Sequence, residues 1–79
     1  MSVMFVHARI DIRREVCPMT YVRTKLKLES MAKGETLEVL MSEGEATRNV
    51  PRSAAEEGHQ ILSLEPSDSG TWRLLIRKE

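Results

Sequence analysis

Three consecutive segments near the start of the chain constrain its fold most strongly. Ala8 to Arg13 alternates apolar and polar residues, which is the pattern of a half-buried strand. Pro18 to about Ala32 is rich in helix-forming residues, and Thr36 to Met41 alternates again. A strand, a helix and a second strand in this order form a crossover unit. We therefore expect two parallel strands with the helix on one face of their sheet.

The helical segment carries an apolar stripe at three- and four-residue spacing. Its expected members are Tyr21, Thr24, Leu28 and Met31, with Val22 and Leu26 widening the stripe and Met19 partly exposed. Gly34 is expected to end this helix.

A second, shorter helix is predicted from near Ala46 or Asn49 to Glu57. Proline lacks the amide hydrogen that a helix interior needs, so Pro51 is expected in the first turn, with Asn49 or a neighbour as the cap. Gly58 is expected to end this helix.

Two strands should complete the chain, from His59 to about Glu65 and from Thr71 to Lys78. The turn-forming sequence at 66–70 makes them an antiparallel hairpin, and Trp72 is expected in the core. The predicted fold is α/β (α+β): one domain over 1–79, a two-layer sandwich in the order β-α-β-α-β-β. Two helices cover one face of a four-stranded mixed sheet.

Cys17 is the only cysteine and directly precedes Pro18. The residue before a proline avoids helical geometry, while proline suits the first helical position, so Cys17 is expected to cap the first helix. Helix amides and the positive end of the helix dipole lower a thiol pKa from about 8.5 toward neutrality. Cys17 is therefore a candidate nucleophile. The alternative interpretation is a small, inert hydrophobic residue.

The net charge is zero, but the charges are unevenly distributed. Six basic residues and two acidic ones lie between Arg9 and Lys27, around the thiol. The candidates for electrostatic support or docking are Arg13, Arg14, Arg23 and Lys25. Because nucleic-acid-binding domains are usually basic overall, we expect no direct nucleic-acid binding.

A single cysteine excludes an internal disulfide and suits a reducing compartment. The apolar stretch Val3 to Val6 is too short for a signal peptide core or a membrane span, so we expect a cytoplasmic protein without membrane contact. His7, His59 and Cys17 lack the spacing of a metal site, and we expect none.

Short motifs along almost the whole chain resemble the TusA/SirA-like sulfur-carrier family. They are Asp11-Ile12-Arg13, Cys17-Pro18-Met19, Arg23-Thr24-Lys25, Lys33-Gly34-Glu35, Leu37-Glu38-Val39-Leu40, Val50-Pro51, Gly58-His59 and Leu75-Ile76-Arg77-Lys78. In two places the chain departs from the family pattern. Thr20 stands where a second proline is usual, and Asn49 stands where an aspartate is usual.

The resemblance implies that Cys17 carries a persulfide as a covalent intermediate, with no other cofactor. It also implies a donor such as a cysteine desulfurase or rhodanese-type protein, and an acceptor sulfur-relay protein. Transfer RNA thiolation, molybdenum-cofactor synthesis and sulfur oxidation are the possible pathways. Pro18, Met19 and Thr20 would support the thiolate at the helix entry, and a carrier is favoured over a turnover enzyme. A non-catalytic interaction or regulatory module on this fold, or a selenium- or redox-handling relative, stays open.

Overall fold

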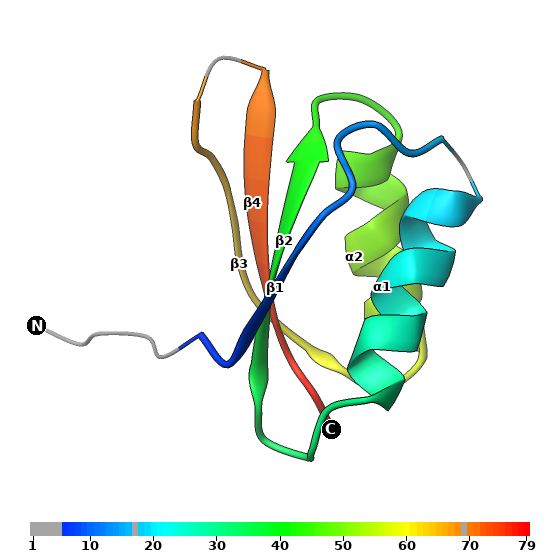
Figure 1. Ribbon diagram of the computed structural model, residues 1–79, viewed down its shortest axis with the longest axis vertical. Coiled ribbons are helices and arrows are strands. Elements are labelled where there is room, and N and C mark those ends of the chain that lie inside the picture. Colours follow the sequence, from blue (N-terminus) through cyan, green and yellow to red (C-terminus); the bar gives the residue numbers. More distant parts are fainter. Residues whose placement is uncertain (1–5, 17, 69) are drawn as a thin grey trace, which may run out of the picture.

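The computed structural model describes residues 6–16, 18–68 and 70–79. Its elements follow in the order β1 (Ala8–Asp11), α1 (Met19–Glu29), β2 (Thr36–Ser42), α2 (Ala46–Glu56), β3 (Gln60–Pro66) and β4 (Thr71–Arg77). The strands form one mixed sheet in the order β1-β2-β4-β3, and both helices lie on the same face of it (Figure 1). The predicted two-layer α+β sandwich is confirmed.

The strand pairing places two loops at one edge of the sheet. β1 pairs with β2 in parallel, from Ala8 opposite Leu37 to Asp11 opposite Leu40, whereas β4 is antiparallel to both β2 and β3. Each of the two parallel strands is followed by a helix, so α1 and α2 both begin at the edge where β1 and β2 end (Figure 1). The segment before α1, which contains the predicted site, therefore lies next to the segment before α2.

The core between sheet and helices is aliphatic. Its buried cluster consists of Ile12, Leu28, Leu37, Val39, Met41, Val50, Ala54, Leu74 and Ile76. Trp72 is half-buried and outside this cluster, and its Nε1 donates to Glu43 Oε1 at 3.3 Å, so the prediction of a core tryptophan is wrong. No helix in the described ranges is long and apolar enough to cross a membrane.

Helix α1 differs from its prediction at both ends. It begins at Met19, one residue late, and ends at Glu29, because the Ser30 amide and hydroxyl both donate to the Lys27 carbonyl and close the last turn. Gly34 does not end the helix. It lies in the turn before β2 with φ 88°, and its amide donates to the Lys78 carbonyl at 2.7 Å.

The face that α1 presents to the sheet is also narrower than predicted. Thr20, Thr24 and Leu28 are buried, whereas Val22 and Leu26 are exposed. The predicted widening of the stripe by these two residues is wrong, and the outer surface of α1 carries both apolar side chains as a result.

Helix α2 begins at Ala46, the first of the two predicted starts, and has as many residues as α1. Asn49 and Pro51 both lie inside it and Glu45 occupies the N-cap position, so the predicted cap and the first-turn proline are wrong. Gly58, with φ 95°, ends the helix as predicted. Its amide donates to the Ala55 carbonyl and the His59 amide donates to the Ala54 carbonyl, which is the Schellman pattern.

β3 begins one residue later than predicted, at Gln60, whereas β4 begins at the predicted residue and ends one residue early, at Arg77. On the sheet face away from the helices, β2 contributes a buried carboxylate, Glu38. Arg9 forms an ion pair with it, and Arg73 Nε lies 3.5 Å from its Oε2. These contacts tie β1, β2 and β4 together.

Candidate functional site

Cys17, the predicted nucleophile, lies outside the described residues. Its neighbours Val16 and Pro18 are both exposed, and Val16 retains 73% of its accessible surface. They belong to the segment that joins the end of β1 to the start of α1 (Figure 1). The position of Cys17 itself, at the carboxyl end of the first strand, stays a prediction.

Helix α1 begins one position later relative to the Cys-Pro pair than predicted. Pro18 is the N-cap, with φ −93° and ψ 4°, and Met19 is the first helical residue. The predictions that Cys17 caps the helix and that Pro18 opens it are wrong by one residue. The first turn contains no acidic residue and no side-chain cap, so nothing on α1 itself neutralises the positive end of its dipole.

Thr20 and Tyr21 are the second and third residues of α1, after Met19. Pro18 has no amide hydrogen, and the Met19 amide donates to the Val16 carbonyl at 2.7 Å. Within residues 6–16, 18–68 and 70–79, the amides of Thr20 and Tyr21 have no acceptor. The first amides of a helix lack intrahelical partners and bind anions when one is near. Any amide support at this helix entry would come from Thr20 and Tyr21, because Pro18 has no amide hydrogen.

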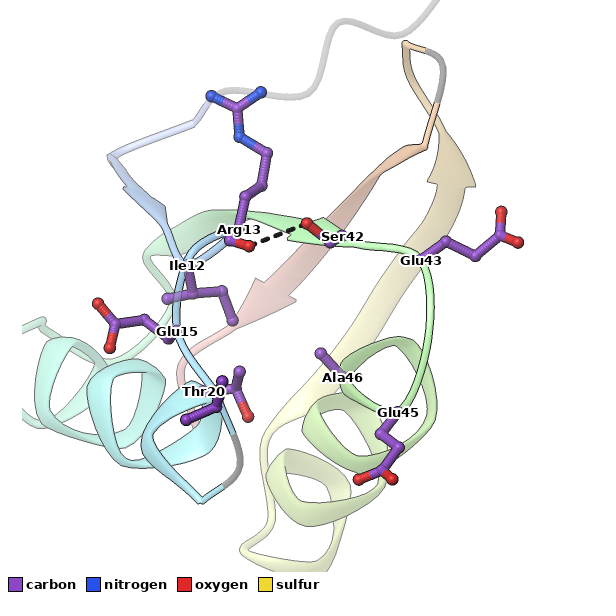
Figure 2. Close-up of a pocket in the computed structure, with 9 residues that line it drawn as sticks. Ile12, Arg13, Glu15, Thr20, Ser42, Glu43, Glu45 and Ala46 are labelled. Atoms are coloured by element: carbon purple, nitrogen blue, oxygen red, sulfur yellow. Dashed lines mark hydrogen bonds between the residues drawn. The ribbon is translucent and has the colours of Figure 1, made fainter.

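A pocket lies between the segments that precede the two helices (Figure 2). It has a volume of about 260 Å³ and is lined by Ile12, Arg13, Glu15, Val16, Thr20, Ser42, Glu43, Glu45 and Ala46. Apolar atoms make up most of its surface, and Thr20, only 5% exposed, contributes from α1. Figure 2 shows the carboxylates of Glu15, Glu43 and Glu45 directed outward around it. The pocket that Val16 lines therefore has an acidic rim.

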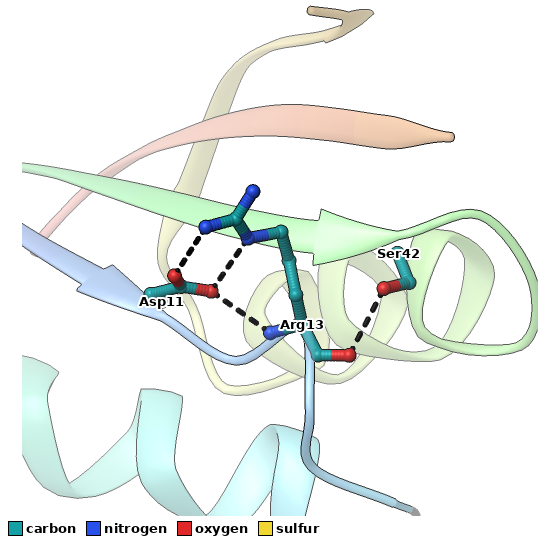
Figure 3. A network of polar contacts seen from close by, with 3 residues as sticks. All are labelled: Asp11, Arg13 and Ser42. Carbon is teal, nitrogen blue, oxygen red and sulfur yellow. Dashed lines mark hydrogen bonds and ion pairs between the residues drawn. The ribbon is translucent and has the colours of Figure 1, made fainter. Parts of the chain in front are cut away.

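The guanidinium group of Arg13 does not face this pocket. Its Nε donates to Asp11 Oδ1 at 2.9 Å and its NH2 donates to Oδ2 at 2.7 Å, while its backbone amide donates to Oδ1 at 3.0 Å (Figure 3). Its carbonyl accepts a hydrogen bond of 2.9 Å from Ser42 Oγ, which fastens the loop to the end of β2. Arg13 is thus a partner of Asp11 and a structural link between the two loops.

Two of the other three predicted cations are also paired. Arg23 NH1 lies 3.5 Å from Glu15 Oε2, and Lys25 Nζ lies 3.6 Å from Glu57 Oε2. Arg14 is exposed and has no ion pair in the part of the chain that the structure describes. The basic stretch of sequence therefore does not become a uniform basic surround in space, because the carboxylates of Asp11, Glu15 and Glu57 pair with it.

The Asp11–Arg13 pair makes a testable prediction. Hydrogen bonds from the Arg13 side chain, and next from its backbone amide, lower the pKa of Asp11 to about 2. A lowered pKa in the folded state stabilises the protein above the ordinary aspartate pKa of about 3.9, and this contribution is lost as the pH falls through about 2. A carbon NMR titration of the Asp11 carboxyl should show this low pKa. Arg13→Met should raise it toward the ordinary value.

Arg14→Met is the matched control, because Arg14 acts on Asp11 only through its charge. It should leave the pKa of Asp11 close to 2. An ordinary aspartate pKa in the wild-type protein would contradict the bidentate geometry.

Sequence reasoning missed the side of the site that comes from the β2–α2 loop. Ser42, Glu43, Glu45 and Ala46 all line the pocket, yet none was singled out. The information was present in the predicted parallel pairing, since the carboxyl ends of parallel strands lie at the same edge.

Within the described ranges, no group of three histidine, cysteine or acidic side chains could hold a metal. His59 Nδ1 accepts a hydrogen bond from the Glu79 amide at 3.2 Å.

Comparisons with known proteins agree on one family. The family model described as "Sulfurtransferase TusA" matches residues 8–78. A protein of Archaeoglobus fulgidus named "Putative sulfur carrier protein" is 50% identical over 70 residues, covering 89% of this chain and 80% of the relative. A protein of Thermotoga maritima with the same name is 34% identical, covering 86% of each chain. The crystal structure of a SirA-like protein from Desulfitobacterium hafniense superposes with a TM-score of 0.79 at 25% identity, covering 89% of this chain and 95% of that one.

Proposed function

The chain belongs to the TusA family of sulfurtransferases, and from this premise we propose that it accepts a sulfane sulfur as a persulfide on Cys17 and passes it to an acceptor protein. The family and the names of the relatives support a sulfur-carrier role in general. The covalent form of the sulfur and the residue that carries it are the proposal. No cofactor other than this persulfide is proposed.

The transfer steps balance without an external oxidant or reductant. The Cys17 thiolate attacks the terminal sulfur of a donor persulfide, a bond from Cys17 to that sulfur forms, and the donor thiolate leaves. An acceptor nucleophile then attacks the same terminal sulfur, and the Cys17 thiolate leaves in turn. Hydrogen-bond donors at the helix entry would stabilise both the thiolate and the persulfide anion of Cys17.

The observation that supports this chemistry best is the start of α1, where the amides of Thr20 and Tyr21 lie in the first turn. Thr20 and Tyr21 offer them without a competing acceptor in the described residues, and the first turn carries no acidic side chain. Thr20 matters here because a proline at that position would remove one of the two amides. The chain's departure from the usual family motif thus adds a donor at the helix entry.

The carrier role also agrees with the cysteine count. Cys17 is the only thiol in the sequence, so no second cysteine can attack its persulfide and release the sulfur as sulfide. A cysteine desulfurase or rhodanese-type protein is the proposed donor, and a sulfur-relay protein the proposed acceptor. The pathway and the cytoplasmic location stay predictions.

Sulfur loading of the wild-type protein tests the proposal. Incubation with a cysteine desulfurase and cysteine, or with inorganic polysulfide, should be followed by alkylation and intact mass measurement. We expect one added sulfur, about 32 Da, on the peptide that contains Cys17. A wild-type protein that gains no sulfur from either donor would refute a persulfide carrier.

A further inference from the structure

We propose that the groove between α1 and the edge strand β1 is the docking surface for a partner protein that presents a large apolar side chain among carboxylates. This inference rests on the proposed function, because the partner is the protein that gives sulfur to the site or takes it away. The groove has a volume of about 400 Å³ and is lined by Ile10, Met19, Arg23, Leu26, Lys27 and Ser30. Met19 places one end of it two residues from Cys17.

The distribution of exposed apolar side chains supports a partner at this face. Among the described residues, the large hydrophobic side chains that are exposed are Val16, Met19, Val22, Leu26 and Leu64. All but Leu64 lie between Val16 and Leu26, and Leu26 is 61% exposed. Helix α1 packs on the sheet through Thr20, Thr24 and Leu28, so these outer residues add nothing to the core. A cluster of exposed apolar side chains on a small protein indicates an interaction site.

Charge specifies the chemistry of the occupant. Arg23 and Lys27 flank the apolar part of the groove, and no acidic residue of α1 precedes Glu29. Lys27 has no ion pair in the described residues, and the pair of Arg23 with Glu15 is 3.5 Å long between partly exposed side chains. An apolar centre with a positive rim is complementary to an apolar side chain surrounded by carboxylates.

The opposite side of the thiol segment fixes the orientation of docking. There the pocket next to α2 carries the carboxylates of Glu43 and Glu45 on its rim, together with Glu15, which pairs with Arg23. An acidic partner surface is attracted to the α1 side of the segment and repelled from the α2 side. The two sides therefore favour a single approach, over α1, which brings the partner's reacting sulfur to the residue before Pro18.

Amide NMR of the full chain tests the proposal directly. The probe is a short synthetic peptide with one leucine flanked by glutamates, and the control peptide has lysines in place of the glutamates. The acidic peptide should shift the amides of Ile10, Met19, Leu26 and Lys27, and the basic peptide should not. Leu26→Asp should abolish the shifts, and Lys27→Glu should weaken binding roughly five- to tenfold. Leu64→Asp, the matched exposed leucine on β3, should bind as the wild type does.

Each other outcome overturns the proposal. Shifts located elsewhere, equal shifts with the basic peptide, or no shifts at all would remove the groove as an acidic-partner site. Groove signals that depend on protein concentration without peptide would make the occupant a second copy of this chain.

Polysulfide loading separates this inference from the proposed function, because it needs no protein partner. If Leu26→Asp still gains one sulfur on Cys17 but peptide binding is unchanged, the docking surface is wrong and the carrier function stands. If the wild-type protein gains no sulfur, the carrier function itself fails.

Discussion

Serine in place of Cys17 should abolish sulfur loading completely, while the free energy of unfolding should stay within about 0.5 kcal/mol of the wild-type value. A serine hydroxyl is not ionised at neutral pH and forms no persulfide, so the transfer step has no nucleophile. We expect the fold not to need the thiol, because the flanking residues Val16 and Pro18 are exposed. Intact mass after polysulfide treatment and urea unfolding measure the two effects.

Thr20→Val is the control variant for this experiment. It keeps the backbone amide and nearly the same side-chain volume at the start of α1, and it removes only the hydroxyl from the pocket lining. It should retain a mass increase of about 32 Da on Cys17. An equal mass increase on Cys17→Ser would mean that the sulfur binds somewhere else and would exclude Cys17 as the carrier residue.

The sheet order and the helix positions could be predicted because their causes are local. The alternation from Ala8 onward and from Thr36 onward defines two strands, and the helix between them requires a parallel crossover. Gly58 ends α2 because its positive φ suits glycine and allows the Schellman hydrogen bonds. Each of these features depends on residues that are near one another in sequence.

The errors concern choices that depend on the folded surroundings. Helical periodicity placed both leucines on the inner face of α1, but in the folded protein Leu28 is buried and Leu26 is exposed. Pro51 was confined to a first turn because proline cannot donate to a helix carbonyl, yet α2 continues through it with Val50 and Ala54 packed into the core. Tertiary packing outweighs the local cost there.

The electrostatics of the site were the least predictable part. Counting charges along the chain suggested a basic surround for Cys17, but Asp11 captures Arg13 through a turn and Glu57 reaches Lys25 from the far end of α2. The β2–α2 loop brings Glu43 and Glu45 to the same edge. Charge density in sequence therefore gave the wrong picture of the local field, whereas strand pairing would have located the carboxylates.

Two leucines of α1 make a second, internally controlled prediction. Leu28 is fully buried among β2, β4 and α2 residues of the core cluster, and Leu26, two positions earlier, is 61% exposed. Leu28→Ala should lower the free energy of unfolding by about 2–5 kcal/mol, because the lost transfer energy adds to the cost of the cavity left behind. A domain of this size has only about 5–15 kcal/mol in total, so the variant should be close to unfolding at moderate temperature.

Leu26→Ala makes the same chemical change in the same helix, so helix propensity cancels between the two variants. Its free energy of unfolding should change by no more than about 0.5 kcal/mol. Urea unfolding followed by circular dichroism measures both. Equal losses in the two variants would contradict the orientation of α1 on the sheet, and with it the exposed groove that Leu26 lines. We expect the Leu26→Ala protein to be stable, to load sulfur from polysulfide, and to bind the acidic peptide more weakly than the wild type. This result would show that the residues that hold α1 in place differ from those that bind a partner.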